Sequence, residues 1–99
     1  MAARLKPVQP GEILKEDFMR PLGLSINRLA QDLGVPPNRV SAILSGRRAI
    51  TADTALRLER YFGVTAQTWL NLQSHYELRL AQRRVGKQIA RVVRPREAA

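Results

Sequence analysis

Side chains able to recognise DNA bases gather in one short segment of the chain. The amide of Asn38 can form two hydrogen bonds with the edge of adenine, and the guanidinium of Arg39 can do the same with guanine. Pro37 and Ala42 offer apolar contact, for instance to a thymine methyl group, and Ser41 is expected on the same helix face. The alternative is that Asn38 is an ordinary first-turn helix residue and Arg39 a solvated charge. The surrounding pattern favours base or phosphate contact.

The stretch at residues 26–45, INRLAQDLGVPPNRVSAILS, has the pattern of a helix-turn-helix that would position these side chains. Ala30 is small where the second helix must cross the first, and Gly34 tolerates the positive φ that the turn needs. Val40 can place an apolar side chain between the two helices. The alternative is a helical hairpin of an ordinary all-α domain, which would also contain leucines and a glycine after its first helix. The remaining inward positions are expected to be Ile26, Leu29, Leu33, Val35 and Ile43.

The charge of the chain favours DNA binding. Its 99 residues include 17 Lys and Arg against 8 Asp and Glu, a net charge of +9. Asn27 and Arg28 begin the first helix of the motif, the end expected to contact the DNA backbone. Arg47 and Arg48 follow the second helix, where phosphates would lie. For Arg47 and Arg48 the alternative is an exposed loop pair without a partner.

The composition argues against several other classes of protein. There is no cysteine, and therefore no disulfide, no thiolate metal site and no cysteine nucleophile. His75 is the only histidine, so we expect a surface residue rather than a metal ligand or a catalytic base. Neither a signal peptide nor an apolar segment long enough to cross a membrane is visible. We therefore expect a cytoplasmic protein without cofactor, metal or enzymatic activity.

Hydrophobic periodicity predicts five helices and no core strand. Pro21 is expected to stop the first helix, and Gly86 to interrupt or end the fifth. Ser25, Thr51 and Thr65 are suitable N-terminal caps. The predicted fold is therefore a compact all-α, five-helix domain. The helices are expected at residues 11–19, 25–34, 36–46, 51–63 and from 65 onward.

Positive charge is concentrated at the C-terminal end. Residues 79–99 contain seven Lys and Arg and a single Glu, which accounts for +6 of the net charge of +9. We therefore predict a helix-turn-helix domain at residues 1–81 and a basic tail at 82–99. The tail is expected to lie along the DNA backbone as an electrostatic arm, and the alternative is a disordered, solubilising end. A weak amphipathic pattern runs through it at Val85, Ile89, Val92 and Val93, before Pro95.

An apolar stripe on the fifth helix suits the core, a dimer interface or contact with another protein. Trp69 and Leu72 are expected in the core, because the apolar stripe of a helix is more often buried. Tyr76 and Leu80 lie beyond the reach of four short helices, so we predict that they form a dimer interface.

With these elements in place, the chain resembles the HigA-type antitoxins, a branch of the phage-repressor-like helix-turn-helix proteins. The resemblance rests on PGEIL at 10–14, the motif at 26–45, ITADTALRLERYFG at 50–63, WLNLQ at 69–73, and Tyr76. It implies a DNA-binding antitoxin that neutralises a partner ribonuclease toxin. It also implies a homodimer that represses its own operon at a palindromic operator. The basic tail departs from this pattern, because related toxins are themselves basic and like charges repel each other.

Two other functions stay open at this point. The first is a stand-alone helix-turn-helix repressor with no toxin partner. The second is a basic module that binds RNA or a membrane surface through its tail. RNA-binding modules usually expose aromatic side chains for stacking, whereas Phe18, Phe62 and Trp69 are expected to be buried here.

Overall fold

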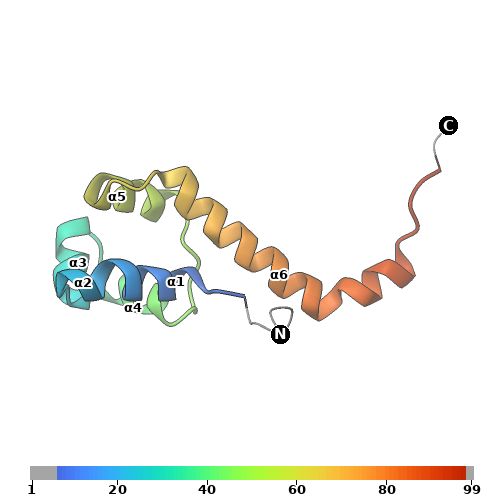
Figure 1. Cartoon of the computed structure of the whole chain (residues 1–99), viewed down its shortest axis with the longest axis horizontal. Helices are drawn as coiled ribbons and strands as arrows, with labels where there is room; N and C mark the ends of the chain where they lie inside the picture. Colours follow the sequence, from blue (N-terminus) through green and yellow to red (C-terminus); the bar gives the residue numbers. More distant parts are fainter. Residues whose placement is uncertain (1–6, 98–99) are drawn as a thin grey trace.

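The computed structural model describes residues 7–97, and all regular structure within that range is helical (Figure 1). The first three segments are continuous along the chain, so the described residues form five helices. The prediction of an all-α, five-helix fold is therefore confirmed. The segments are α1 (Pro10–Ile13), η2 (Leu14–Met19), α2 (Arg20–Leu22), α3 (Ile26–Leu33), α4 (Pro37–Leu44), α5 (Ala52–Phe62) and α6 (Ala66–Val92).

The first helix continues past Pro21, so the prediction that this proline stops it was wrong. Its middle part, η2, is π-helical, and the N–H of Arg20 donates to the carbonyl oxygen of Lys15. Pro21 comes directly after this π-helical part, as the second residue of the three-residue α2. The helix ends instead before Gly23, which adopts a left-handed conformation.

The segments α3 and α4 form the predicted helix-turn-helix. The hydroxyl oxygen of Ser25 accepts a hydrogen bond from the N–H of Arg28 at 3.0 Å and so caps α3. The helix ends at Gly34, whose φ of +72° suits glycine and few other residues. The N–H of Val35 then donates to the carbonyl oxygen of Ala30 at 3.0 Å, which closes the turn before α4.

The core lies where the first helix, α3, α4 and α5 meet the start of α6. Trp69 is fully buried, as predicted. Its ring centroid lies 5.0 Å from that of Phe18, which in turn lies 5.1 Å from Phe62. Phe18, Phe62 and Leu72 are half-buried against the core, so the aromatic contacts join η2, α5 and α6. The buried apolar residues of the described chain are Leu14, Met19, Leu29, Ala30, Leu33, Val35, Val40, Ile43, Ile50, Ala55, Leu58 and Trp69.

Gly11 allows the first helix to pass very close to α4. A Cβ atom added at Gly11 would overlap the carbonyl oxygen of Ile43. Because that oxygen belongs to the backbone of α4, a larger residue would push the two helices apart. Gln9 supports the same contact, since its amide nitrogen donates to the carbonyl oxygen of Leu44 at 3.1 Å. The first helix thus sets the position of α4 through direct backbone contact.

The last helix, α6, is continuous from Ala66 to Val92, so the prediction that Gly86 interrupts or ends it was wrong. A glycine inside a helix costs only about 1 kcal/mol relative to alanine, and the neighbouring Arg, Lys and Gln residues favour the helix. The predicted boundary between residues 81 and 82 therefore falls inside α6. The division into domain and tail stays a prediction.

The C-terminal part of α6 extends away from the other helices (Figure 1). With 27 residues the helix is about 40 Å long. The molecule measures 54 × 34 × 22 Å, and its radius of gyration is 16.8 Å, against about 13 Å for a compact chain of this length. Ile89 and Val92 are exposed on the projecting part. The basic segment is therefore helical as far as Val92, and this helical part extends beyond the core.

Candidate nucleic-acid interface

The start of α3 and the outer face of α4 line a shallow, open groove of about 500 Å³. Asn27, Pro37 and Asn38 are exposed there and Ser41 is half-buried, whereas Val40 is buried in the core. The helix-turn-helix pattern predicts such a face for entry into the major groove of DNA. The structure thus brings together Asn27 from α3 and Pro37, Asn38 and Ser41 from α4.

Ile26 lines the same groove, although the sequence pattern placed it among the inward residues. That prediction was wrong, because 37% of Ile26 is exposed. Ile26 is the first residue of α3, directly after its cap Ser25, and no preceding turn of helix covers it. Its place at the helix start is the signal that could have identified it. Ala42, expected to offer apolar contact, is half-buried and does not line this groove.

Arg39 is not among the residues that line this groove. Its Nη1 atom donates to Oδ1 of Asp53 at 2.9 Å, and only 23% of its side chain is exposed. Its Nε atom is buried and has no hydrogen-bond partner among the described residues. Hydrogen bonds from Arg57 and then from Arg39 hold the pKa of the Asp53 carboxyl below its ordinary value. The contact of Arg39 with DNA stays a prediction.

Arg28 is paired on the surface of α3. Its Nε atom lies 3.1 Å from the carboxylate of Asp32, and 67% of its side chain is exposed. Hydrogen bonds from Tyr61 and then from Arg28 lower the pKa of Asp32, and the bond to Asp32 raises the pKa of Tyr61. The Asp32 side chain is 23% exposed, and the contact of Arg28 with DNA stays a prediction.

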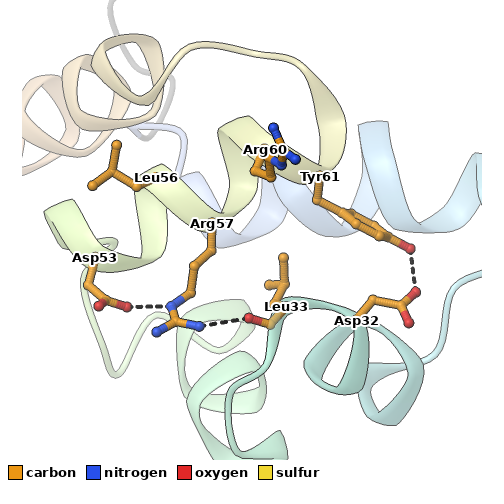
Figure 2. Close-up of a pocket in the computed structure, with 7 residues that line it drawn as sticks. All are labelled: Asp32, Leu33, Asp53, Leu56, Arg57, Arg60 and Tyr61. Carbon is orange, nitrogen blue, oxygen red and sulfur yellow. Dashed lines mark hydrogen bonds and ion pairs between the residues drawn. The ribbon is translucent and has the colours of Figure 1, made fainter.

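A network of hydrogen bonds ties α5 to the helix-turn-helix (Figure 2). Figure 2 shows Arg57 between Asp53 and Leu33: its Nε donates to Asp53 at 2.7 Å and its Nη1 to the Leu33 carbonyl oxygen at 2.9 Å. Leu33 ends α3, so Arg57 satisfies a carbonyl that the helix end leaves without a partner. Tyr61 makes a second link by donating to Asp32 at 2.6 Å. Sequence reasoning missed these two links because their partners are 24 and 29 residues apart.

Arg47 and Arg48 lie exposed in the loop after α4, and their contact with phosphates stays a prediction. The Nε atom of Arg47 donates to the hydroxyl oxygen of Ser45 at 3.0 Å. The backbone N–H groups of both arginines lie within hydrogen-bond distance of the carbonyl oxygen of Ala42, at 2.9 and 3.1 Å. The loop therefore holds two cations next to the C-terminal end of α4.

Tyr76 and Leu80 are half-buried rather than fully exposed. Together with Gln9 and Arg48 they line a cavity of about 210 Å³ between α6 and the loop after α4. Their own chain thus covers part of each side chain, and the dimer interface stays a prediction. His75 is exposed, which confirms the surface position expected for it.

Metal sites and membrane-spanning helices are two further features that a structure can reveal. Within residues 7–97, groups of three or more metal-ligating side chains do not occur. No helix in the same range is long and apolar enough to cross a membrane.

The helix-turn-helix family model matches residues 15–69, more than half of the chain. Virulence-associated protein I of Dichelobacter nodosus is 53% identical over 75 residues, which make up 76% of this chain and 69% of that protein. Among solved structures, an addiction module antidote protein of the HigA family from Coxiella burnetii is 49% identical. Its TM-score is 0.88, and the match covers 93% of this chain and 100% of that one.

A second similar structure is the Pseudomonas aeruginosa antitoxin HigA with the higBA promoter. It is 43% identical, with a TM-score of 0.88, and the match covers 91% of this chain and 98% of that one. Both solved structures match almost the whole chain, so the similarity includes α6 as well as the motif. The chain therefore belongs to the helix-turn-helix family, in its branch of HigA-type antitoxins.

Proposed function

We propose that this protein is a sequence-specific DNA-binding antitoxin that represses its own operon. The observation that carries the proposal is the groove between α3 and α4, which Asn27 and Asn38 line with exposed amides. The net charge of +9 supplies attraction to phosphates. The similar HigA of Pseudomonas aeruginosa was solved with a promoter, which supports DNA as the partner.

The residues of this surface fall into two groups, those that contact bases and those that contact phosphates. Asn38 binds base edges in the major groove, and Ser41 and Pro37 flank it. Arg39 takes part by exchanging the carboxylate of Asp53 for a base or a phosphate. Phosphate contacts hold the protein in register without reading sequence. The proposed phosphate contacts are Asn27, Arg28, Arg47 and Arg48.

Each chain contains one helix-turn-helix motif, so two chains are needed to bind the two half-sites of a palindromic operator. The two recognition helices of such a dimer lie about 34 Å apart, one turn of DNA. We assign the interface to Tyr76 and Leu80, because both side chains keep part of their apolar surface free. Sedimentation should find a dimer on operator DNA. A monomer at micromolar concentration, both free and on DNA, would contradict this assignment.

The proposed protein partner is a ribonuclease toxin encoded beside this protein. In this role the protein works in the cytoplasm and has no catalytic activity of its own. Co-expression with the neighbouring toxin should yield a stable complex and restore growth. A neighbouring reading frame that encodes no such toxin would favour a stand-alone repressor instead.

Footprinting on the DNA upstream of its own reading frame tests the central part of the proposal. We expect two protected half-sites related by a palindrome, with their centres about one helical turn apart. Random DNA of equal length serves as the control, because charge alone also gives binding. Equal protection of both DNAs would contradict sequence-specific binding. It would favour the alternative of a basic module that binds RNA or a membrane surface through its charge.

A further inference from the structure

Ile26 is a partly exposed apolar residue that lies between the groove of α3 and α4 and a second pocket shared with Met19, Leu24 and Leu44. It lines the groove between α3 and α4 together with Pro37, while the other lining residues carry hydroxyl or amide groups. At 37% exposure it leaves a substantial apolar area in contact with water. Because Ile26 and Pro37 lie in one groove, they give it an apolar part that can contact an apolar group of a bound ligand.

The edges of DNA bases offer one such group in the major groove. Adenine, guanine and cytosine present hydrogen-bond donors and acceptors there, whereas thymine also presents its C5 methyl group. Asn38 and Ser41 can bind the polar atoms of a base pair, and Ile26 and Pro37 can contact a methyl group beside them.

We infer that the side chains of Ile26 and Pro37 contact a thymine methyl group in each operator half-site. Ile26 then determines specificity, although it belongs to α3 and not to the recognition helix α4. The inference rests on the proposed DNA-binding function, and it adds the class of base that the groove selects.

Three features favour a base over another occupant. Asn27 and Asn38, which are proposed to contact DNA, line the same groove, so a ligand bound in it lies within the proposed DNA interface. A phosphate would gain nothing from an isoleucine and a proline, because both side chains lack hydrogen-bond donors. The basic character of the chain also disfavours a basic protein as the occupant.

Replacement of single thymines by deoxyuridine tests the inference, since it removes the methyl group and keeps every hydrogen-bonding atom. The affinity of the full chain for each substituted operator is measured by fluorescence anisotropy. We expect one position in each half-site at which the substitution weakens binding about fourfold, the value for one buried methyl group. Wild-type protein that binds every uracil-substituted operator as tightly as the original would overturn the inference.

The variant Ile26→Ala should bind the thymine operator a few-fold more weakly and should lose the preference for thymine over uracil at that position. Leu22→Ala is the matched control: Leu22 is 65% exposed but does not line the groove, so the preference should persist. Circular dichroism checks that both variants remain folded. An Ile26→Ala protein that still prefers thymine as strongly as wild type would also overturn the inference.

The two proposals fail in different ways. If wild-type protein protects no specific site upstream of its reading frame, the proposed function fails and the inference fails with it. If specific binding is present but insensitive to thymine methyl groups, only the role of Ile26 is refuted.

Discussion

Arg39, on the helix proposed to read DNA, donates a hydrogen bond to Asp53 of α5 at 2.9 Å. The same oxygen of Asp53 accepts a second hydrogen bond from Arg57 at 2.7 Å, and Arg57 also binds the carbonyl oxygen of Leu33. One carboxylate thus links α4 to α5 and, through Arg57, to the end of α3. Although α5 carries no proposed DNA contact, it determines where Arg39 lies.

The variant Asp53→Asn should release Arg39 to DNA. Loss of the negative charge removes the group that competes with phosphates for the guanidinium. We expect tighter binding to operator and random DNA at low salt. Because Arg39 already binds DNA in the proposed wild-type complex, the number of contacts, and with it the slope of log affinity against log salt, should stay near that of the wild type. Binding titrations at several salt concentrations measure both quantities.

Asp17→Asn is the control for this variant. It makes the same change of charge at an exposed position of η2, away from Arg39. Its affinity for both DNAs should stay near that of the wild type, because Arg39 keeps its ion pair with Asp53. If Asp53→Asn instead weakens binding to the operator alone, Asp53 positions Arg39 for base contact and does not compete with DNA.

Two substitutions separate base contacts from phosphate contacts. Asn38→Ala should lose about 1–3 kcal/mol of discrimination between operator and random DNA, because it removes a bidentate contact with a base. Arg39→Ala should act in the same direction. Arg47→Ala should weaken binding to all sequences alike and reduce the salt slope by about one. Equal losses on both DNAs for Asn38→Ala and Arg39→Ala would show that the reading surface lies elsewhere.

The bond between Tyr61 and Asp32 predicts a dependence of stability on pH. The pKa of Asp32 is lowered in the folded protein, first by Tyr61 and then by Arg28. The folded state therefore binds this proton more weakly than the unfolded chain does. The resulting stabilisation is present above about pH 4, near the ordinary pKa of aspartate, and is lost as the pH falls further.

Tyr61→Phe tests this link without altering a charge. The variant should raise the pKa of Asp32, as followed by NMR of the carboxyl carbon. Asp53 is the internal reference, because Arg57 and Arg39 lower its pKa and Tyr61 is not among the causes. A shift of both carboxyl groups, or of neither, would contradict the assignment.

Two glycine substitutions should change stability in opposite directions. Gly11→Ala should destabilise the fold by about 1–3 kcal/mol, because its methyl group would overlap the backbone of α4 at Ile43. Gly86→Ala should stabilise it by about 0.5–1 kcal/mol, since Gly86 lies inside α6 with nothing within 4 Å of an added Cβ. Urea unfolding measures both. A stable Gly11→Ala protein would mean that the two helices can separate without cost.

Truncation after Ala81 should leave a folded protein with unchanged operator preference. The removed part of α6 contributes no residue to the buried core of the described chain. Its cations should bind phosphates, so the salt slope should fall by roughly 0.9 for each phosphate that the shortened protein no longer binds. An unchanged slope would indicate a solubilising end. Loss of folding or of dimerisation would assign Val85 and Ile89 to the core or the dimer interface.

The sequence predicted best those features that depend on near neighbours in the chain. Ser25, Gly34 and Val40 act within the motif itself, and the structure places each in the role that its spacing indicates. Composition alone also indicated the surface position of His75. The helix-turn-helix and the outer face of α4 could therefore be derived from the order of the residues alone.

Other features depend on contacts that no local spacing reveals. Arg39 is one example, since its partner Asp53 lies 14 residues away. Pro21 and Gly86 were given too much weight as helix breakers. A π-helical turn precedes Pro21, and good helix formers surround Gly86. Ile26 has the helical spacing of the buried residues of α3. Because it lies in the first turn of the helix, it is nevertheless exposed.

The projecting end of α6 also affects how large the protein behaves in solution. A molecule 54 Å long and 22 Å thick diffuses more slowly than a sphere of equal mass. On a gel-filtration column calibrated with globular standards, a single chain of 11.2 kDa should therefore elute early and mimic a larger assembly. Light scattering reports mass independently of shape, so it distinguishes an elongated monomer from a true pair of chains.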